Sequence, residues 1–251
     1  MDLSKLSVPK LHEEQARWLG SWSRVARQLL VSLRSHITYK FADQKEGAAE
    51  RYFRSIYSGT RYDDLLFDGK DWAYYQKLTK IINMDMFGEA QIIDVGCGNG
   101  SLYRWLQRDN RSPRMYSGID IAHPDVEVDA SASIHCADVL TVDFGNIVDS
   151  RAVLALVNSL CYLDDERFSH LLHQSNYISE LIVVEPVPGI FWDAHFDGAM
   201  LYYRHPETLL ARLTETGWIP QAVAVDYLVA LGSIKMVPLS ICIHAVPADS
   251  L

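Results

Sequence analysis

The chain has 251 residues, 49% of them hydrophobic, which suffices for a substantial core in one large or two small domains. Its net charge of −9, without a lysine- and arginine-rich run, argues against unaided binding to nucleic acid. The start of the chain lacks the apolar core of a signal peptide, and no stretch approaches the ~20 apolar residues of a membrane span. The scattered cysteines form no Cys-x-x-Cys pair. We therefore expect a cytoplasmic protein with reduced thiols and no membrane partner.

The first predicted element is a long amphipathic helix over residues 11–36. Its apolar side chains recur at helical spacing and define one face. That face is formed by Trp18, Trp22, Val25, Leu29, Leu30 and Leu33. Such a stripe predicts packing against the rest of the chain or against a second subunit, so a homodimer is one interpretation.

Residues 41–62 and 71–84 also have helical spacing and hold several tyrosines. Aromatic side chains combine a large apolar surface with a polar tip, which suits the cover of a ligand pocket. We select Tyr52, Tyr57 and Tyr62 as pocket contacts, with ordinary packing as the alternative for each.

A glycine-rich turn follows. Residues 92–100 read Ile-Ile-Asp-Val-Gly-Cys-Gly-Asn-Gly, and residues 101–109 then have helical spacing. This pattern predicts a buried strand, a turn that needs positive φ angles, and a helix whose first amide groups point at the turn. The third glycine comes one residue earlier than in Gly-x-Gly-x-x-Gly, and Asp94 would repel a pyrophosphate but pair with an ammonium group. The ligand should therefore carry a cationic amine near the glycines.

The next two predicted strands also end in acids. Residues 115–120 end at Asp120, and residues 134–138 end at Asp138. A carboxylate at the end of the second strand of a βαβ unit can accept both hydroxyls of a ribose. A single strand-end aspartate is more often a cap or turn residue, but three of them in register with a glycine turn favour a ligand site.

Together these residues resemble the class I S-adenosylmethionine-dependent methyltransferases. Motif I of that family is close to Asp-x-Gly-x-Gly-x-Gly, which Asp94, Gly96, Gly98 and Gly100 match, and Asp120 matches its motif II. The resemblance implies S-adenosylmethionine as the cofactor, with Asp138 accepting from the adenine amino group. The cofactor-binding residues it implies are Asp94, Gly96, Cys97, Gly98, Asn99, Gly100, Asp120, Ile121, Asp138, Val139, Asn158, Tyr52 and Tyr57.

Strand and helix patterns continue to alternate after the acids. Residues 153–157 and 181–185 are apolar runs typical of strands buried on both faces, and residues 164–177 between them have helical spacing. Residues 221–231 and 239–246 predict two longer strands, whose antiparallel pairing fits the family's seventh strand. We therefore expect an α/β, Rossmann-like doubly wound seven-stranded sheet with an N-terminal helical cap.

The predicted domain organisation is a helical cap or lid over residues 1–86 and a cofactor-binding catalytic domain over residues 87–251. A lid insertion at about residues 187–206 leaves the carboxyl edge of the sheet, where ligands of open α/β sheets bind. We expect it to wall the acceptor pocket. The predicted substrate contacts are Tyr62, Trp192, Tyr202, Tyr203 and Arg204.

Three residues are candidates for catalysis. Histidine is the natural base for a hydroxyl or an acidic carbon, and we choose His195 first and His205 second. For His205 the alternative is an imperfect cap of a helix opened by Pro206. Tyr162 follows the fourth strand with Asn158, at the family's motif IV position beside the transferred methyl group.

The residues that follow the fourth predicted strand also bear on the kind of acceptor and on metal binding. The polar-Pro-Pro-aromatic motif of DNA and protein amide methylators is missing there, which weakens a base- or amide-modifying function. Catechol-type members place metal-binding acids here, but Asn158 stands at the strand end, and Asp164 and Asp165 are better explained as a helix start. We predict no metal.

The leading hypothesis is methylation of a small molecule at O, N or C, in specialised metabolism. The first alternative is an enzyme of the same fold that uses the cofactor without methylating, by cyclisation or by transfer of the aminocarboxypropyl arm. Another is a catalytically inactive cofactor-binding scaffold. A nicotinamide oxidoreductase is disfavoured by Asp94 and by the early third glycine.

Overall fold

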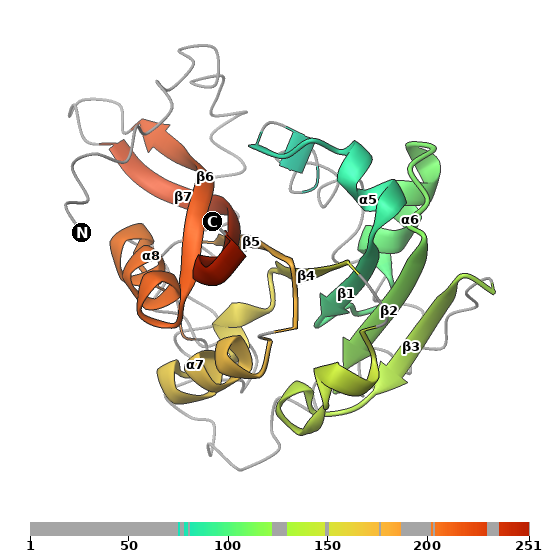
Figure 1. Cartoon of the computed structure of the whole chain (residues 1–251). Helices are drawn as coiled ribbons and strands as arrows, with labels where there is room; N and C mark the ends of the chain where they lie inside the picture. The colour runs from blue at the N-terminus through green and yellow to red at the C-terminus, as the bar shows by residue number, and fades with distance from the viewer. Residues whose placement is uncertain are drawn as a thin grey trace, which may run out of the picture.

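A single mixed sheet organises the described part of the chain (Figure 1), with strand order β3-β2-β1-β4-β5-β7-β6. The computed structural model describes residues 75, 78–79, 81–121, 130–148, 151–175, 177–186, 202, 204–229 and 236–250. The strands are β1 (Gln91–Val95), β2 (Met115–Asp120), β3 (Ala132–Cys136), β4 (Ala152–Val157), β5 (Glu180–Pro186), β6 (Trp218–Val229) and β7 (Met236–Pro247). The first five are parallel, and β7 pairs antiparallel with both β5 and β6. The predicted doubly wound sheet with a late antiparallel strand is confirmed.

Helices lie on both faces of this sheet. They are α5 (Asp85–Glu89), α6 (Ser101–Arg108), α7 (Asp165–Gln174) and α8 (Pro206–Glu215), with short 3-10 helices η3 (Val139–Thr141), η4 (Phe144–Asn146), η5 (Leu160–Tyr162) and η6 (Ala248–Ser250). In the part of the chain that the structure describes, no helix is both long and apolar enough to cross a membrane.

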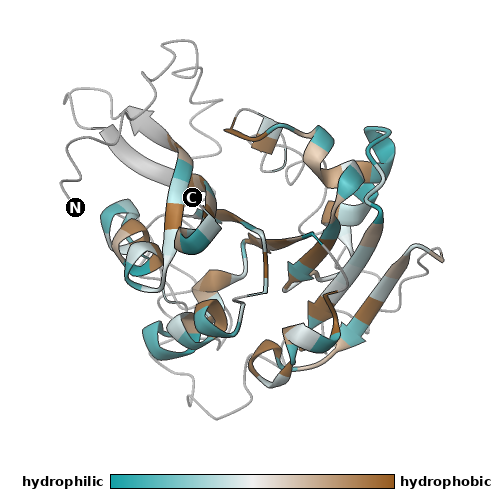
Figure 2. Cartoon of the chain, in the orientation of Figure 1, coloured by the Kyte–Doolittle hydropathy of each residue, from teal (hydrophilic) through white to brown (hydrophobic). Residues whose placement is uncertain are grey.

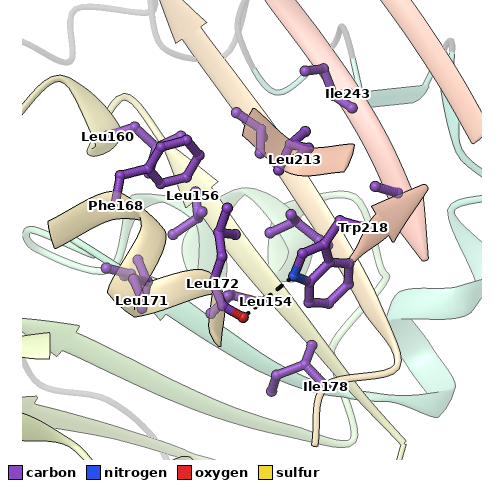
Figure 3. Close-up of a cluster of buried hydrophobic side chains, with 14 of the residues drawn as sticks. Leu154, Leu156, Leu160, Phe168, Leu171, Leu172, Ile178, Leu213, Trp218 and Ile243 are labelled. Atoms are coloured by element: carbon purple, nitrogen blue, oxygen red, sulfur yellow. Dashed lines mark hydrogen bonds between the residues drawn. The ribbon is translucent and has the colours of Figure 1, made fainter. Parts of the chain in front are cut away.

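Alternate strand residues pack on opposite faces, as the two-residue period of a strand requires. Ile92 of β1 joins a cluster with α5 and α6, whereas Ile93 joins the cluster with α7 and α8. Figure 3 shows the second cluster, in which the indole of Trp218 donates to the carbonyl of Leu172 at 3.5 Å. In Figure 2, hydrophobic and hydrophilic residues alternate along α7 and α8, as expected of helices with one buried face.

The predicted strand bounds agree with the structure within a few residues, but the end of the third strand changes the role of one predicted site residue. This strand ends at Cys136, so Asp138 lies beyond the strand and is the N-cap of η3. The predicted helix over 164–177 is α7, and Pro206 opens α8 as expected.

The predicted helix over residues 11–36 and the one over 41–62 lie outside the described residues. Within 71–84, the described positions Tyr75, Leu78 and Thr79 are helical. The ring of Tyr75 stacks on that of Trp105 in α6, with 5.4 Å between the ring centroids. This part of the N-terminal segment therefore packs on the α6 side of the sheet.

Candidate functional site

The glycine turn after β1 needs its glycines. Gly96, Gly98 and Gly100 have φ angles of 70°, 53° and 73°, in the left-handed region that side chains disfavour. A Cβ on Gly96 would come within 2.7 Å of the Cβ of Ser159, so space forbids a side chain there too. The Gly96 amide donates to the carbonyl of Ile119 at 2.8 Å, which docks the turn on β2.

The turn leads directly into α6. Gly100 is the N-cap of this helix and, as a glycine, has no side chain to cap the first amides. Asn99 and Cys97 are buried within the turn, and the side-chain Oδ1 of Asn99 accepts from the hydroxyl of Ser101 at 2.6 Å. Cys97 lies over Gly118 of β2, where an added Cβ would approach its sulfur within 2.7 Å. Exposed backbone at Gly96, beside a helix start whose N-cap residue has no capping side chain, fits a polar ligand.

Asp94 lies one residue before the end of β1 and is buried. The hydroxyl of Tyr116 on β2 donates to its Oδ2 at 2.5 Å. Burial raises the pKa of Asp94 to about 7; the Tyr116 hydrogen bond opposes this rise, and the nearby carboxylate of Asp120 adds to it. A cationic ligand group beside Asp94 would favour the ionised carboxylate. Tyr116 was not among the residues that the sequence pattern indicated.

Asp120 ends β2 and is also buried. Its Oδ2 accepts from the amide of Gly98 at 2.9 Å, so this carboxylate holds the glycine turn as well as facing the sheet edge. Ile121 follows it and is partly exposed. The residues that match motif I and motif II are therefore in direct contact. Their positions along the sequence did not by themselves imply this contact.

Asp138 has a structural role at one of its oxygens. Its Oδ1 accepts from the amide of Leu140 at 3.0 Å and so caps η3, the alternative expected of a turn aspartate. Val139 is buried in the cluster under α7. A contact of Asp138 with adenine stays a prediction.

The loop between β4 and α7 faces the glycine turn. Asn158 is exposed and has a φ of 57°, which is uncommon outside glycine and marks a constrained position. Its amide donates to the carbonyl of Val184 at 2.7 Å. The amides of Ser159 and Leu160 both donate to Oε1 of Glu185, at 2.7 and 2.6 Å.

Glu185 is a site residue that the sequence analysis missed. Its side chain is 5% exposed at the end of β5, and burial raises its pKa to about 8, against the two backbone amides that lower it. The available signal was its position, because an acid closes an apolar strand here just as Asp94 and Asp120 do near the ends of theirs. Carboxyl groups therefore stand at the same edge on three strands.

Arg204 fixes the same loop by binding its backbone carbonyl groups. Its guanidinium donates to the carbonyl of Leu160 at 3.2 Å, to that of Leu163 at 2.7 Å and to Asp165 at 2.9 Å. It also lies 4.9 Å from the centroid of the Phe168 ring. These contacts make Arg204 a buried positioning residue, and its predicted contact with substrate stays a prediction.

The other predicted substrate and catalytic residues are only partly described. Tyr202 is half-buried and its amide donates to the carbonyl of Cys161 at 2.6 Å, which brings it to η5 and Tyr162. His205 is exposed at the N-cap of α8, without a side-chain cap hydrogen bond, as the alternative for it predicted. The residues outside the described part are Tyr52, Tyr57, Tyr62, Trp192, His195 and Tyr203. Among the described residues, no three His, Cys, Asp or Glu side chains gather in a way that could hold a metal ion.

Comparisons with known proteins find the fold but no close relative. No family model and no curated protein matches the chain. The 1,6-didemethyltoxoflavin-N1-methyltransferase of Burkholderia thailandensis, solved with S-adenosylhomocysteine, is similar with a TM-score of 0.58 and 14% identity over 81% of this chain and 88% of its own. The magnesium protoporphyrin IX methyltransferase of Synechocystis, also with S-adenosylhomocysteine, has a TM-score of 0.53 and 13% identity over 79% of this chain and 99% of its own.

A third structure, an S-adenosylmethionine-dependent methyltransferase of Leishmania major, has a TM-score of 0.58 and 13% identity over 79% of this chain and 82% of its own. At such identities the likeness establishes architecture. The chain has the Rossmann-like fold of the class I methyltransferases.

Proposed function

We propose that this protein is an S-adenosylmethionine-dependent methyltransferase that acts on a small-molecule acceptor. One observation carries the proposal: Asp94, the glycine turn and Asp120 converge at the adjacent ends of β1 and β2, where the amide of Gly98 donates a hydrogen bond to Asp120. A sheet edge with this turn and two carboxylates suits a ligand that joins a ribose to a cationic amine.

The residues of the site divide this ligand between them. The Asp94 carboxylate is suited to the ammonium group, and Asp120 to the ribose hydroxyls. The start of α6, where Gly100 has no side chain to cap the helix, offers further donors, and Asp138 remains the candidate for the adenine amino group. The cofactor supplies a methyl group on a sulfonium that is already activated. The protein then has to align acceptor and methyl group and exclude water.

A small acceptor is supported by two observations and by one expectation from the sequence. The acidic net charge of −9 disfavours nucleic acid. The sequence predicts that residues 1–86 form a helical cap, which would enclose the site. Two proteins of similar fold are named for small acceptors, 1,6-didemethyltoxoflavin and magnesium protoporphyrin IX. We extend the proposal to a cytoplasmic role in specialised metabolism, with His195 or His205 as the base where the acceptor needs one.

Calorimetric titration with S-adenosylmethionine tests the cofactor. We expect saturable one-site binding that Asp120→Ala weakens at least tenfold, because the ribose and the Gly98 amide both lose an acceptor. Asp143→Ala is the matched control, since Asp143 likewise accepts from a backbone amide, that of Gly145, at η4 outside the site. No binding at high micromolar concentration, or a preference for a nicotinamide cofactor, would contradict the proposal.

Product analysis with candidate acceptors tests the reaction. Methyl transfer leaves S-adenosylhomocysteine, and attack on the aminocarboxypropyl arm leaves methylthioadenosine. A rearrangement of bound substrate leaves the cofactor intact, and a scaffold binds it without turnover. Only the first of these products supports a methyltransferase.

A further inference from the structure

The hydroxyl of Ser159 is a buried polar group without a hydrogen-bond partner among the described residues. Ser159 is 7% exposed, directly after Asn158 in the loop between β4 and η5. Buried hydroxyls in folded proteins are nearly always hydrogen-bonded, because leaving one unpaired loses the interaction it had with water. The described residues do not supply a partner for this hydroxyl, so a bound ligand is a candidate for that role.

The location of this hydroxyl relates it to the glycine turn. The Oγ of Ser159 lies 3.7 Å from the position that a Cβ on Gly96 would occupy, and Gly96 itself is exposed. Because β4 pairs with β1, the residues that follow both strands meet at the same sheet edge. Asp94 stands on that edge near the end of β1. The hydroxyl thus lies beside the open backbone of the turn, on the β4 side of the site.

The loop that carries Ser159 is fixed on both sides. Glu185 accepts from the amides of Ser159 and Leu160, and Arg204 donates to the carbonyls of Leu160 and Leu163. Glu185 comes from β5, and Arg204 comes from the residues before α8, with its guanidinium against Phe168 of the α7 cluster. Such fixation holds a hydrogen-bonding group in its binding position before the ligand arrives.

We propose that Ser159 binds the amino-acid arm of the cofactor through its hydroxyl, and that Glu185 positions it for this contact. The inference rests on the proposed function. The arm carries an ammonium group, for which Asp94 is suited, and a carboxylate, to which a hydroxyl donates a charge-assisted hydrogen bond. Ser159 therefore discriminates ligands that have the arm from those that have only the nucleoside.

The experiment measures binding of S-adenosylmethionine, S-adenosylhomocysteine and adenosine by calorimetry, together with thermal unfolding of the ligand-free protein. We expect Ser159→Ala to weaken both arm-bearing ligands about tenfold and to leave adenosine unchanged. The ligand-free variant should unfold at the same or a higher temperature than the wild type, because an unpaired buried group has been removed. A merely structural role for Ser159 would instead lower that temperature.

Ser175→Ala is the matched control. Ser175 is equally buried, but its hydroxyl donates to the carbonyl of Leu172 at 2.8 Å, at the end of α7. This variant should unfold at a lower temperature and bind all ligands as the wild type does. Wild-type affinity of Ser159→Ala for S-adenosylmethionine, or an equal loss for adenosine, overturns the inference while leaving the proposed function intact.

The positioning role of Glu185 has its own test. Glu185→Ala leaves the amides of Ser159 and Leu160 without an acceptor, so it should weaken the arm-bearing ligands and not adenosine. Glu185→Gln keeps an acceptor oxygen and should restore the wild-type affinity. Wild-type binding by Glu185→Ala overturns the positioning role. If the wild type binds neither S-adenosylmethionine nor S-adenosylhomocysteine, the proposed function itself is overturned.

Discussion

Replacement of Glu185 by glutamine should change how the stability of the protein depends on pH. Burial raises the pKa of this carboxyl from 4.5 to about 8 in the folded protein. Between these values the unfolded chain has released the proton and the folded protein still binds it. The free energy of unfolding therefore falls as the pH rises through this interval, and levels off above the folded-state pKa. The carboxyl is neutral in both states below pH 4.5.

The magnitude follows from the two pKa values. One pH unit corresponds to about 1.4 kcal/mol, so the rise from 4.5 to about 8 amounts to about 5 kcal/mol of lost stability at high pH. In Glu185→Gln the amide oxygen can still accept from Ser159 and Leu160, but it does not titrate. The stability of the variant relative to the wild type should therefore increase by about 5 kcal/mol between acid and alkaline pH.

Urea unfolding followed by tryptophan fluorescence, at constant ionic strength and at several pH values from about 4.5 to 8.5, measures this difference. Glu166→Gln is the control, because Glu166 is exposed in the first turn of α7. Its effect should stay below about 1 kcal/mol throughout. Parallel pH profiles for the wild type and Glu185→Gln would refute the reasoning, since they would mean that the buried carboxyl is ionised in the folded protein.

Three further predictions concern the site. The pKa of Asp94 is about 7 in the free protein, and an ammonium ligand binds the carboxylate form. As the pH rises toward 7, the affinity for S-adenosylmethionine should therefore increase by up to about tenfold per pH unit. Calorimetry should find this pH dependence lost in Asp94→Asn. Gly96→Ala should lower the free energy of unfolding in urea by about 2 to 4 kcal/mol, because the φ of Gly96 is 70° and an added Cβ would overlap Ser159. Gly88→Ala, with open space around it, should raise the free energy of unfolding by up to about 1 kcal/mol. Equal effects would contradict the assignment of strain to Gly96. Arg204→Lys should lose about 2 kcal/mol in thermal unfolding, because buried carbonyls lose donors, and unchanged stability would contradict its positioning role.

Local patterns in the chain were enough to predict most of the described fold. The apolar runs and their alternation with helical spacing identified β1, β4 and β5, because strands buried on both faces are largely apolar, and β2 was recognised by the acid that closes it. The glycine turn was equally readable, since positive φ angles restrict the choice of residue at each position independently of distant parts of the chain. Pro206 opened α8 for the same kind of local reason.

The end of β3 shows where local patterns fail. Asp138 looks in sequence like the last residue of an apolar strand, as Asp120 is. In the structure β3 pairs with β2 only to Cys136, and the side chain of Asp138 caps η3 instead. Pairing with a neighbouring strand sets where a strand ends, and a residue pattern within one strand does not contain that information.

The sequence by itself determined the glycine turn, the succession of strands and helices along the chain, and the acids near the ends of the strands. Only the tertiary structure decided which of these groups meet: Tyr116 with Asp94, Glu185 with the amides of Ser159 and Leu160, and Arg204 with carbonyls about forty residues earlier. Backbone amides and carbonyls at the end of a strand lack ladder partners, and the side chain that satisfies them is chosen by which strands lie adjacent. That choice depends on sheet order and register, which are properties of the whole fold.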